Sequence, residues 1–144
     1  MKIPAYIVDV DGTVALRKTN PGSRGPYDWS RVDEDVPNLP VIDILKALKT
    51  QDPYTQFLFT SGRSEVCFRE TTAWLRRHGL PVDTLFMRPL GDGRPDQELK
   101  AWIYRESIAP YFRVLAVFDD RAKVVDMWRY EFDLTVLQVA EGNF

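Results

Sequence analysis

Short runs of apolar residues alternate with amphipathic stretches along the whole chain of 144 residues. Five of the apolar runs have the length of buried strands and end at polar residues or turns. Between them, apolar residues recur at helical spacing, as in the segment from Asn38, where Pro40 suits a first helical turn. This alternation predicts a parallel sheet with helices on both faces. The expected strands are 3–8, 57–59, 84–87, 114–118 and 134–139.

The segment 14–38 does not follow this alternation. It holds three prolines and two glycines, with charged residues between them. Because these residues interrupt regular structure, we expect an irregular loop or flap here. The flap is too short for a large cap domain, so the sequence predicts a single domain over 1–144 with an open site.

Composition narrows the chemistry that this domain can perform. Cys67 and His78 are each the only residue of their type, so neither an internal disulfide nor a cysteine and histidine zinc cage can form. The formal net charge is −2, so no overall basic field attracts long nucleic acids. Carboxylates, with a hard metal ion, remain the groups best suited to chemistry. The chain shows neither a secretory signal nor a membrane span, and we expect a cytoplasmic protein.

Acidic and hydroxyl-bearing residues gather where three of the predicted strands end. An Asp-Val-Asp-Gly-Thr motif follows the first strand, Thr-Ser-Gly-Arg follows the second, and an Asp-Asp pair follows the fourth. Because the carboxyl ends of parallel strands meet at the same edge of a sheet, we expect these residues to share one crevice. They are Asp9, Asp11, Thr13, Ser61, Gly62, Arg63, Asp119 and Asp120, with Lys100 on the helix after the third strand.

This set of residues suits phosphoryl transfer. Mg²⁺ held by carboxylates can neutralise a phosphate monoester and bridge to it. One carboxylate can act as the nucleophile and form an aspartyl-phosphate, while a second, two residues on, protonates the leaving alkoxide and later activates water. Serine, arginine and lysine side chains can hold the phosphate oxygens as their charge shifts.

These motifs resemble those of the haloacid dehalogenase superfamily of phosphotransferases. The segments 24–28, 61–63 and 119–129 are similar to the 3′-phosphatase domains of phage-type polynucleotide kinase/phosphatases, and the similarity covers essentially the whole chain. The resemblance implies a three-layer α/β sandwich of the Rossmann-like type. Its five-stranded parallel sheet would have the order 3-2-1-4-5, with a small flap in place of a cap domain.

The resemblance also implies roles for individual residues. It implies Mg²⁺-dependent removal of 3′-phosphates from DNA or RNA ends or from nucleotides. Asp9 would be the nucleophile and a metal ligand, and Asp11 the general acid and base, with its backbone carbonyl on the metal. Asp119 would be a further ligand, supported by Asp120. The residues implied to bind phosphate or substrate are Thr13, Arg24, Ser61, Gly62, Arg63, Asp96 and Lys100.

Simpler interpretations stay open for several of these residues. Asp96 and Asp120 each precede a predicted helix and could cap it. Tyr27, Trp29, Arg24 and Arg31 form the best candidate for stacking a base or gripping a backbone phosphate. The tryptophans outside the flap have the spacing of core residues; they are Trp74, Trp102 and Trp128.

Alternative functions stay open as well. A phosphatase of mononucleotides or other small phosphomonoesters would use the same motifs. A receiver-type phospho-acceptor module shares the acidic pair, but its acceptor aspartate follows the third strand, where this chain has Met87 and Arg88. No kinase-type phosphate loop is present, so no kinase activity is expected from these residues. The oligomeric state, and whether a separate kinase or ligase acts with the chain, are left open.

Overall fold

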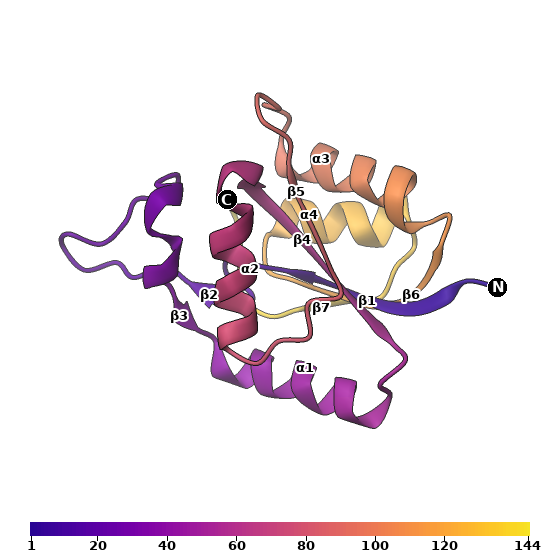
Figure 1. Ribbon diagram of the computed structural model, residues 1–144. Helices are drawn as coiled ribbons and strands as arrows, with labels where there is room; N and C mark the ends of the chain where they lie inside the picture. The colour runs from indigo at the N-terminus through magenta and orange to yellow at the C-terminus, as the bar shows by residue number, and fades with distance from the viewer.

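A parallel five-stranded sheet lies at the centre of the computed structural model, which describes residues 1–144 (Figure 1). From one edge to the other, its strands are β5 (Thr84–Arg88), β4 (Gln56–Ser64), β1 (Ile3–Asp9), β6 (Phe112–Asp119) and β7 (Val136–Gln138). These are the third, second, first, fourth and fifth predicted strands, so the expected order is confirmed. All neighbouring strands in the sheet run parallel.

Helices cover both faces of the sheet, which confirms the three-layer α/β architecture (Figure 1). On one face lie α1 (Leu39–Gln51) and α2 (Phe68–Arg77), and on the other lie α3 (Asp96–Ile103) and α4 (Ala122–Asp126). None of these helices has the length and apolarity needed to cross a bilayer. Short additional turns are η2 (Glu65–Cys67) before α2, η3 (Tyr104–Ile108) after α3 and η4 (Met127–Glu131) after α4.

Side chains alternate between the two faces of the sheet along each strand, so the apolar ones pack into two hydrophobic cores, one on each face. In β1, Ile7 packs into the core under α3 and α4, whereas Val8 packs into the core under α1 and α2. Trp74 and Trp128 are fully buried in these two cores, as their spacing predicted. Trp102 is different, because it stays 37% exposed and lies under the Arg94 guanidinium.

The flap contains more regular structure than the sequence indicated. β2 (Ala15–Leu16) and β3 (Val36–Pro37) form a two-stranded antiparallel ribbon, and η1 (Trp29–Glu34) is a 3-10 helix. The Asp28 side chain accepts a hydrogen bond from the backbone N–H of Ser30 and caps η1. The expectation of an irregular loop is therefore wrong for these segments. They are too short to show a period in the sequence, and tertiary pairing fixes them.

The second strand is longer than predicted. β4 continues beyond Phe59 through the whole Thr-Ser-Gly-Arg motif to Ser64. Ser61 and Arg63 are consequently held by strand geometry and are 0% and 1% exposed. Val66 lies in the 3-10 turn η2, before α2, and is 62% exposed.

Candidate active site

A cavity of about 810 Å³ opens at the carboxyl ends of β1, β4 and β6, between the flap and α3. The structure brings most of the predicted site residues to its wall. Thr13 and Ser61 do not line the cavity, because both are fully buried behind it. The predicted site residues on the wall are Asp9, Asp11, Arg24, Gly62, Arg63, Asp96, Lys100, Asp119 and Asp120.

Three buried carboxylates and one lysine make up the part of the site that we call the acidic cluster: Asp9, Asp119, Asp120 and Lys100. Carboxylate oxygens of the three aspartates lie within 4.8 Å of one another. The Lys100 Nζ donates hydrogen bonds to Asp9 Oδ1 at 2.7 Å and to Asp119 Oδ2 at 3.2 Å. All four side chains come from strand ends or from α3, and each residue is at most 5% exposed.

The acidic cluster carries more negative charge than its lysine can balance. Burial, reinforced by the charge of Asp119, raises the pKa of Asp9 well above its usual range. Burial also raises the pKa of Asp120. For Lys100, burial opposes the charged form, but Asp119 and Asp9 outweigh it and raise its pKa, so the ammonium persists. Clustered carboxylate oxygens with excess negative charge fit a hard divalent cation such as Mg²⁺.

Thr13 and Gly12 pack against the acidic cluster. The Thr13 hydroxyl donates to Asp9 Oδ2 at 2.9 Å and lies 3.4 Å from Asp120 Oδ1. Gly12 has a φ of +81°, and a Cβ atom there would lie 2.1 Å from Asp120 Oδ2. The sharp turn after Asp11 and the close approach of Asp120 therefore both require glycine.

Asp120 does not cap the following helix. The residue at the N-cap position of α4 is Arg121, and no side chain makes a capping hydrogen bond there. Asp119 instead organises this turn, since its Oδ1 accepts hydrogen bonds from the backbone N–H groups of Asp120 at 2.9 Å and Arg121 at 3.4 Å. The capping interpretation of Asp120 was therefore wrong, and its carboxylate faces the cavity.

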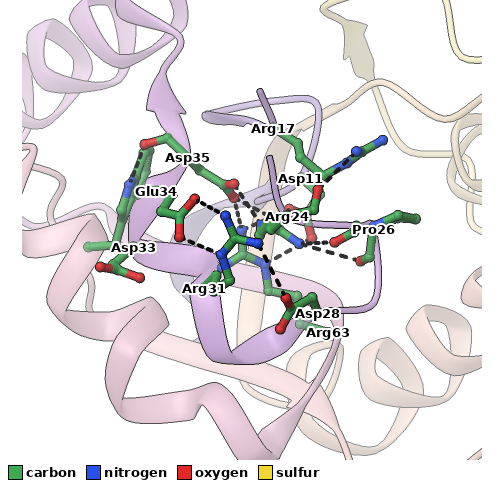
Figure 2. Close-up of polar contacts among 12 residues, drawn as sticks. Asp11, Arg17, Arg24, Pro26, Asp28, Arg31, Asp33, Glu34, Asp35 and Arg63 are labelled. Carbon is green, nitrogen blue, oxygen red and sulfur yellow. Dashed lines mark hydrogen bonds and ion pairs between the residues drawn. The ribbon is translucent and has the colours of Figure 1, made fainter. Parts of the chain in front are cut away.

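A second group of charged residues, the ion-pair cluster, consists of Asp11, Arg24, Asp35 and Arg63 (Figure 2). Arg63 binds Asp11 through two hydrogen bonds, Nε to Oδ2 at 2.9 Å and Nη2 to Oδ1 at 2.8 Å. Arg24 binds Asp35 in the same two-pronged way at 2.8 Å and 2.8 Å. Arg63 Nη2 also reaches Asp35 Oδ2 at 2.7 Å and so joins the two pairs.

The ion-pair cluster fixes the orientation of Asp11. The Asp11 side chain is 44% exposed to the cavity, whereas those of Asp35, Arg24 and Arg63 are 0–2% exposed. Arg63 is held from behind by Thr71, whose Oγ1 accepts from Nη1 at 3.0 Å. The buried members therefore form a rigid support, and Asp11 is the one carboxyl that they present to a ligand.

Asp35 is the main site residue that sequence reasoning missed. It lies between η1 and β3 in the flap, in the acidic stretch Asp33-Glu34-Asp35, where nothing in the pattern separates a buried aspartate from its exposed neighbours. The apolar residue Val32 carried the only usable signal, because its burial shows that the chain turns inward here, whereas Val36 stays exposed.

Arg24 was expected to contact substrate, but its donors are occupied by the protein. Besides binding Asp35, its guanidinium donates to the carbonyl oxygens of Gly25 at 3.1 Å and Pro26 at 3.5 Å, and it lies 3.5 Å from Asp11 (Figure 2). In this arrangement Arg24 fastens the flap to the Asp11 side of the cavity.

Asp96 joins two further arginines at the opposite wall of the cavity. Its carboxylate accepts from Arg88 Nη2 at 2.7 Å and from Arg121 Nη1 at 2.8 Å. Asp96 is the first residue of α3, the N-cap is Pro95, and no capping hydrogen bond exists, so the capping interpretation is wrong here too. Gly62 permits this arrangement, because a Cβ atom there would lie 2.5 Å from Asp96 Oδ1. No role for Arg88 or Arg121 was predicted from the sequence.

Ser61 stabilises the end of β4 and does not line the cavity. Its Oγ accepts a hydrogen bond from the backbone N–H of Arg63 at 3.1 Å. Through this contact it shapes the end of β4, next to the position where Gly62 faces the cavity.

Comparison with known proteins extends this description. The family described as "Polynucleotide kinase PNKP phosphatase domain" matches residues 3–144. A curated relative, the "Putative bifunctional polynucleotide kinase/RNA ligase" of Autographa californica nuclear polyhedrosis virus, is 39% identical over 127 residues, which cover 87% of this chain and 18% of the relative.

Solved structures with a similar fold include chains of two related complexes. A chain in "Structure of Pnkp1/Rnl/Hen1 complex" has a TM-score of 0.90 and 36% identity, covering 99% of this chain and 48% of that one. A chain in "Structure of the Pnkp1/Rnl/Hen1 RNA repair complex" has a TM-score of 0.89 and 38% identity, covering 99% and 44%. Class C acid phosphatase from Bacillus anthracis shares the fold, with a TM-score of 0.63 at 22% identity over 86% of this chain and 54% of that one. The chain thus spans less than half of the matched chains in these two complexes and about a fifth of the viral relative.

Proposed function

Because this chain belongs to the family of polynucleotide kinase PNKP phosphatase domains, we propose that it removes 3′-phosphates from polynucleotide ends with Mg²⁺ as cofactor. Membership of that family confirms the resemblance to haloacid dehalogenase phosphatases and the phosphatase class expected from the sequence. The 3′ specificity and the metal dependence are the proposed part. The observation that carries the phosphatase chemistry and the metal dependence is the acidic cluster beside Asp11 at the carboxyl ends of the central strands. The 3′ specificity is what the resemblance of the motifs implies.

The acidic cluster supplies a nucleophile and a metal site. Asp9 attacks the phosphorus atom, the bond to the leaving 3′-oxygen breaks, and Asp11 donates a proton to that oxygen. Water then gives a proton to Asp11 and attacks the aspartyl-phosphate, which releases phosphate and restores Asp9. Mg²⁺ held by Asp9, Asp119, Asp120 and the backbone carbonyl of Asp11 would neutralise the charge of the phosphate.

The remaining predicted residues divide into two groups. Lys100 stays an ammonium inside the acidic cluster and is placed to hold phosphate oxygens as their charge shifts. The polar groups of Arg24, Arg63 and Asp96 form ion pairs with other side chains. We therefore assign these residues to positioning rather than to phosphate contact. Thr13, Ser61 and Gly62 likewise set the geometry of the strand ends.

An open cavity with a small flap favours a chain end over a small metabolite. About 810 Å³ of space is walled on one side by the flap and on the other by the loop before α3. The competing proposal is a phosphatase of mononucleotides, which uses the same catalytic residues. Rates of phosphate release from a 3′-phosphorylated oligonucleotide, a 3′-mononucleotide and an unrelated sugar phosphate separate the two. A strong preference for the sugar phosphate would contradict the polynucleotide proposal.

The comparisons also suggest which chain ends are processed. One similar structure is described as an RNA repair complex, and the viral relative is described as a polynucleotide kinase/RNA ligase. We therefore propose that this domain acts on RNA ends together with kinase and ligase activities. Matched RNA and DNA oligonucleotides with 3′-phosphates test this, since we expect the higher kcat/KM on RNA.

A further inference from the structure

Four residues of the flap are candidates for contacting a nucleotide: Arg24, Tyr27, Trp29 and Arg31. In the structure, the two arginines are already bound to other groups of the protein. The Arg24 side chain is buried and bound to Asp35. Arg31 binds Glu34 through hydrogen bonds of 2.6 Å and 2.9 Å and the Gly22 carbonyl at 2.7 Å, and it does not line the cavity. Figure 2 shows both guanidinium groups turned toward their carboxylate partners. Tyr27 and Trp29 remain.

Tyr27 and Trp29 form an aromatic pair on the cavity wall. Their ring centroids lie 6.1 Å apart with an interplanar angle of 84°, an edge-to-face arrangement. Trp29 packs partly against the core under α1 and α2, and both residues line the cavity. Tyr27 is 81% exposed, so burial does not explain its position. One ring is therefore anchored, and it supports a second ring that stays free.

The backbone around this pair is tied to the catalytic side of the cavity. Arg24 donates to the carbonyl oxygens of Gly25 and Pro26 while it reaches toward Asp11. The Asp28 N–H donates to the Gly25 carbonyl at 3.2 Å, and the Trp29 N–H donates to the Tyr27 carbonyl at 3.1 Å. These contacts hold the Tyr27 backbone in a fixed relation to Asp11, the residue that faces the leaving oxygen in the proposed reaction.

We propose that the ring of Tyr27, supported by Trp29, is the platform on which the base of the 3′-terminal nucleotide stacks while its phosphate occupies the acidic cluster. Every base has an aromatic face, so such a platform favours nucleotides over other phosphate esters without selecting a sequence. This inference rests on the proposed function and adds to it the part of the substrate that the flap recognises.

Paired changes in the enzyme and the substrate test the platform. Base stacking contributes about 1–3 kcal/mol, so Tyr27→Ala should lower kcat/KM on a 3′-phosphorylated oligonucleotide by about 5- to 150-fold. Tyr27→Phe should stay within about twofold, because it keeps the ring. Tyr130→Ala is the matched control, since Tyr130 is 82% exposed and lies outside the cavity; its kcat/KM should not change.

An otherwise identical oligonucleotide without the terminal base completes the cycle. Removing the base should lower the kcat/KM of the wild-type protein by a similar factor. It should not lower the kcat/KM of Tyr27→Ala any further. If Tyr27→Ala lowers kcat/KM relative to the wild-type protein by the same factor on the abasic and the intact substrate, the ring does not act on the base and the proposal is wrong. If the wild-type protein releases phosphate equally fast from the intact and the abasic oligonucleotide, this inference alone is overturned. A wild-type protein inactive on the intact oligonucleotide overturns the proposed function with it.

Discussion

The acidic cluster and the ion-pair cluster both line one cavity, yet they balance their charges differently. In the acidic cluster, three buried carboxylates share one ammonium, and burial raises the pKa of Asp9. In the ion-pair cluster, two carboxylates meet two guanidinium groups, and hydrogen bonds link all four residues. We propose that a bound cation balances the charge of the first cluster, whereas the charges of the second are balanced within the protein.

This difference in charge balance indicates that the acidic cluster serves the reaction and that the ion-pair cluster holds the site in shape. A buried group with unbalanced charge costs stability and is retained where a reaction uses it. A buried group with balanced charges and two-pronged contacts holds its members in one geometry, and removing one partner leaves the other uncompensated. Asp11 connects the two, because Arg63 orients it from the ion-pair cluster while its carboxyl faces the cavity.

The largest expected effect comes from the acidic cluster. Asp9→Asn removes the nucleophile, so turnover should fall by roughly 10⁴-fold or more. Phosphate release from a 3′-phosphorylated oligonucleotide measures this loss, and circular dichroism checks that the fold is kept. A rate near that of the wild-type protein would rule out the covalent mechanism.

The ion-pair cluster should respond through stability as well as through rate. Asp35→Asn leaves the buried Arg24 guanidinium without its main carboxylate and leaves Arg63 with only Asp11, so the free energy of unfolding should fall by about 3–5 kcal/mol. Urea denaturation measures it. Glu34→Gln is the matched control, because this neighbouring residue binds only the half-exposed Arg31, and its loss should change little. Equal small effects of both changes would refute a structural role for the cluster.

Metal binding should distinguish the two clusters directly. Mg²⁺ at 100 times its Kd should stabilise the wild-type protein by about 2.7 kcal/mol, because it binds only the folded acidic cluster. Thermal unfolding with Mg²⁺ and with a chelator measures the shift in Tm. Asp119→Asn removes one carboxylate from the cluster, and its Tm should no longer respond to Mg²⁺. A response of wild-type size in this variant would place the ion elsewhere.

The smallest expected effect concerns the close approach of the backbone to Asp120. Gly12→Ala forces an alanine into the left-handed region, at a cost of about 1–2 kcal/mol, and its Cβ atom displaces Asp120. The Mg²⁺ concentration for half-maximal activity should therefore rise. Gly25→Ala is the control, since nothing lies within 4 Å of a Cβ atom there. A similar metal requirement in both variants would show that Asp120 can move without consequence.

The sequence predicted those parts of the site that follow directly from strand ends. Asp9 and Asp119 close apolar runs, and parallel strands place their carboxyl ends at one edge, so the carboxylates of the acidic cluster could be expected from the pattern, whereas the role of Lys100 came from the resemblance. The strand order came from the resemblance, and the structure confirms it.

The parts that were missed depend on tertiary contacts that leave no period in the sequence. Asp35 is the single residue between a 3-10 helix and a short ribbon, and only its burial against Arg24 and Arg63 reveals its role. Asp96 stands where a helix cap is common, and its partners Arg88 and Arg121 arrive from other elements. Local propensity therefore favoured the simpler interpretation, and long-range ion pairing overrode it.

Release of phosphate from one oligonucleotide phosphorylated at its 3′ end or at its 5′ end, in the presence of Mg²⁺, tests the central claim most directly. We predict release from the 3′ end, little from the 5′ end, and none from either end in Asp9→Asn. Equal release from both ends, or 3′ release that persists in Asp9→Asn, would contradict the proposal that this chain is a 3′-phosphatase acting through Asp9.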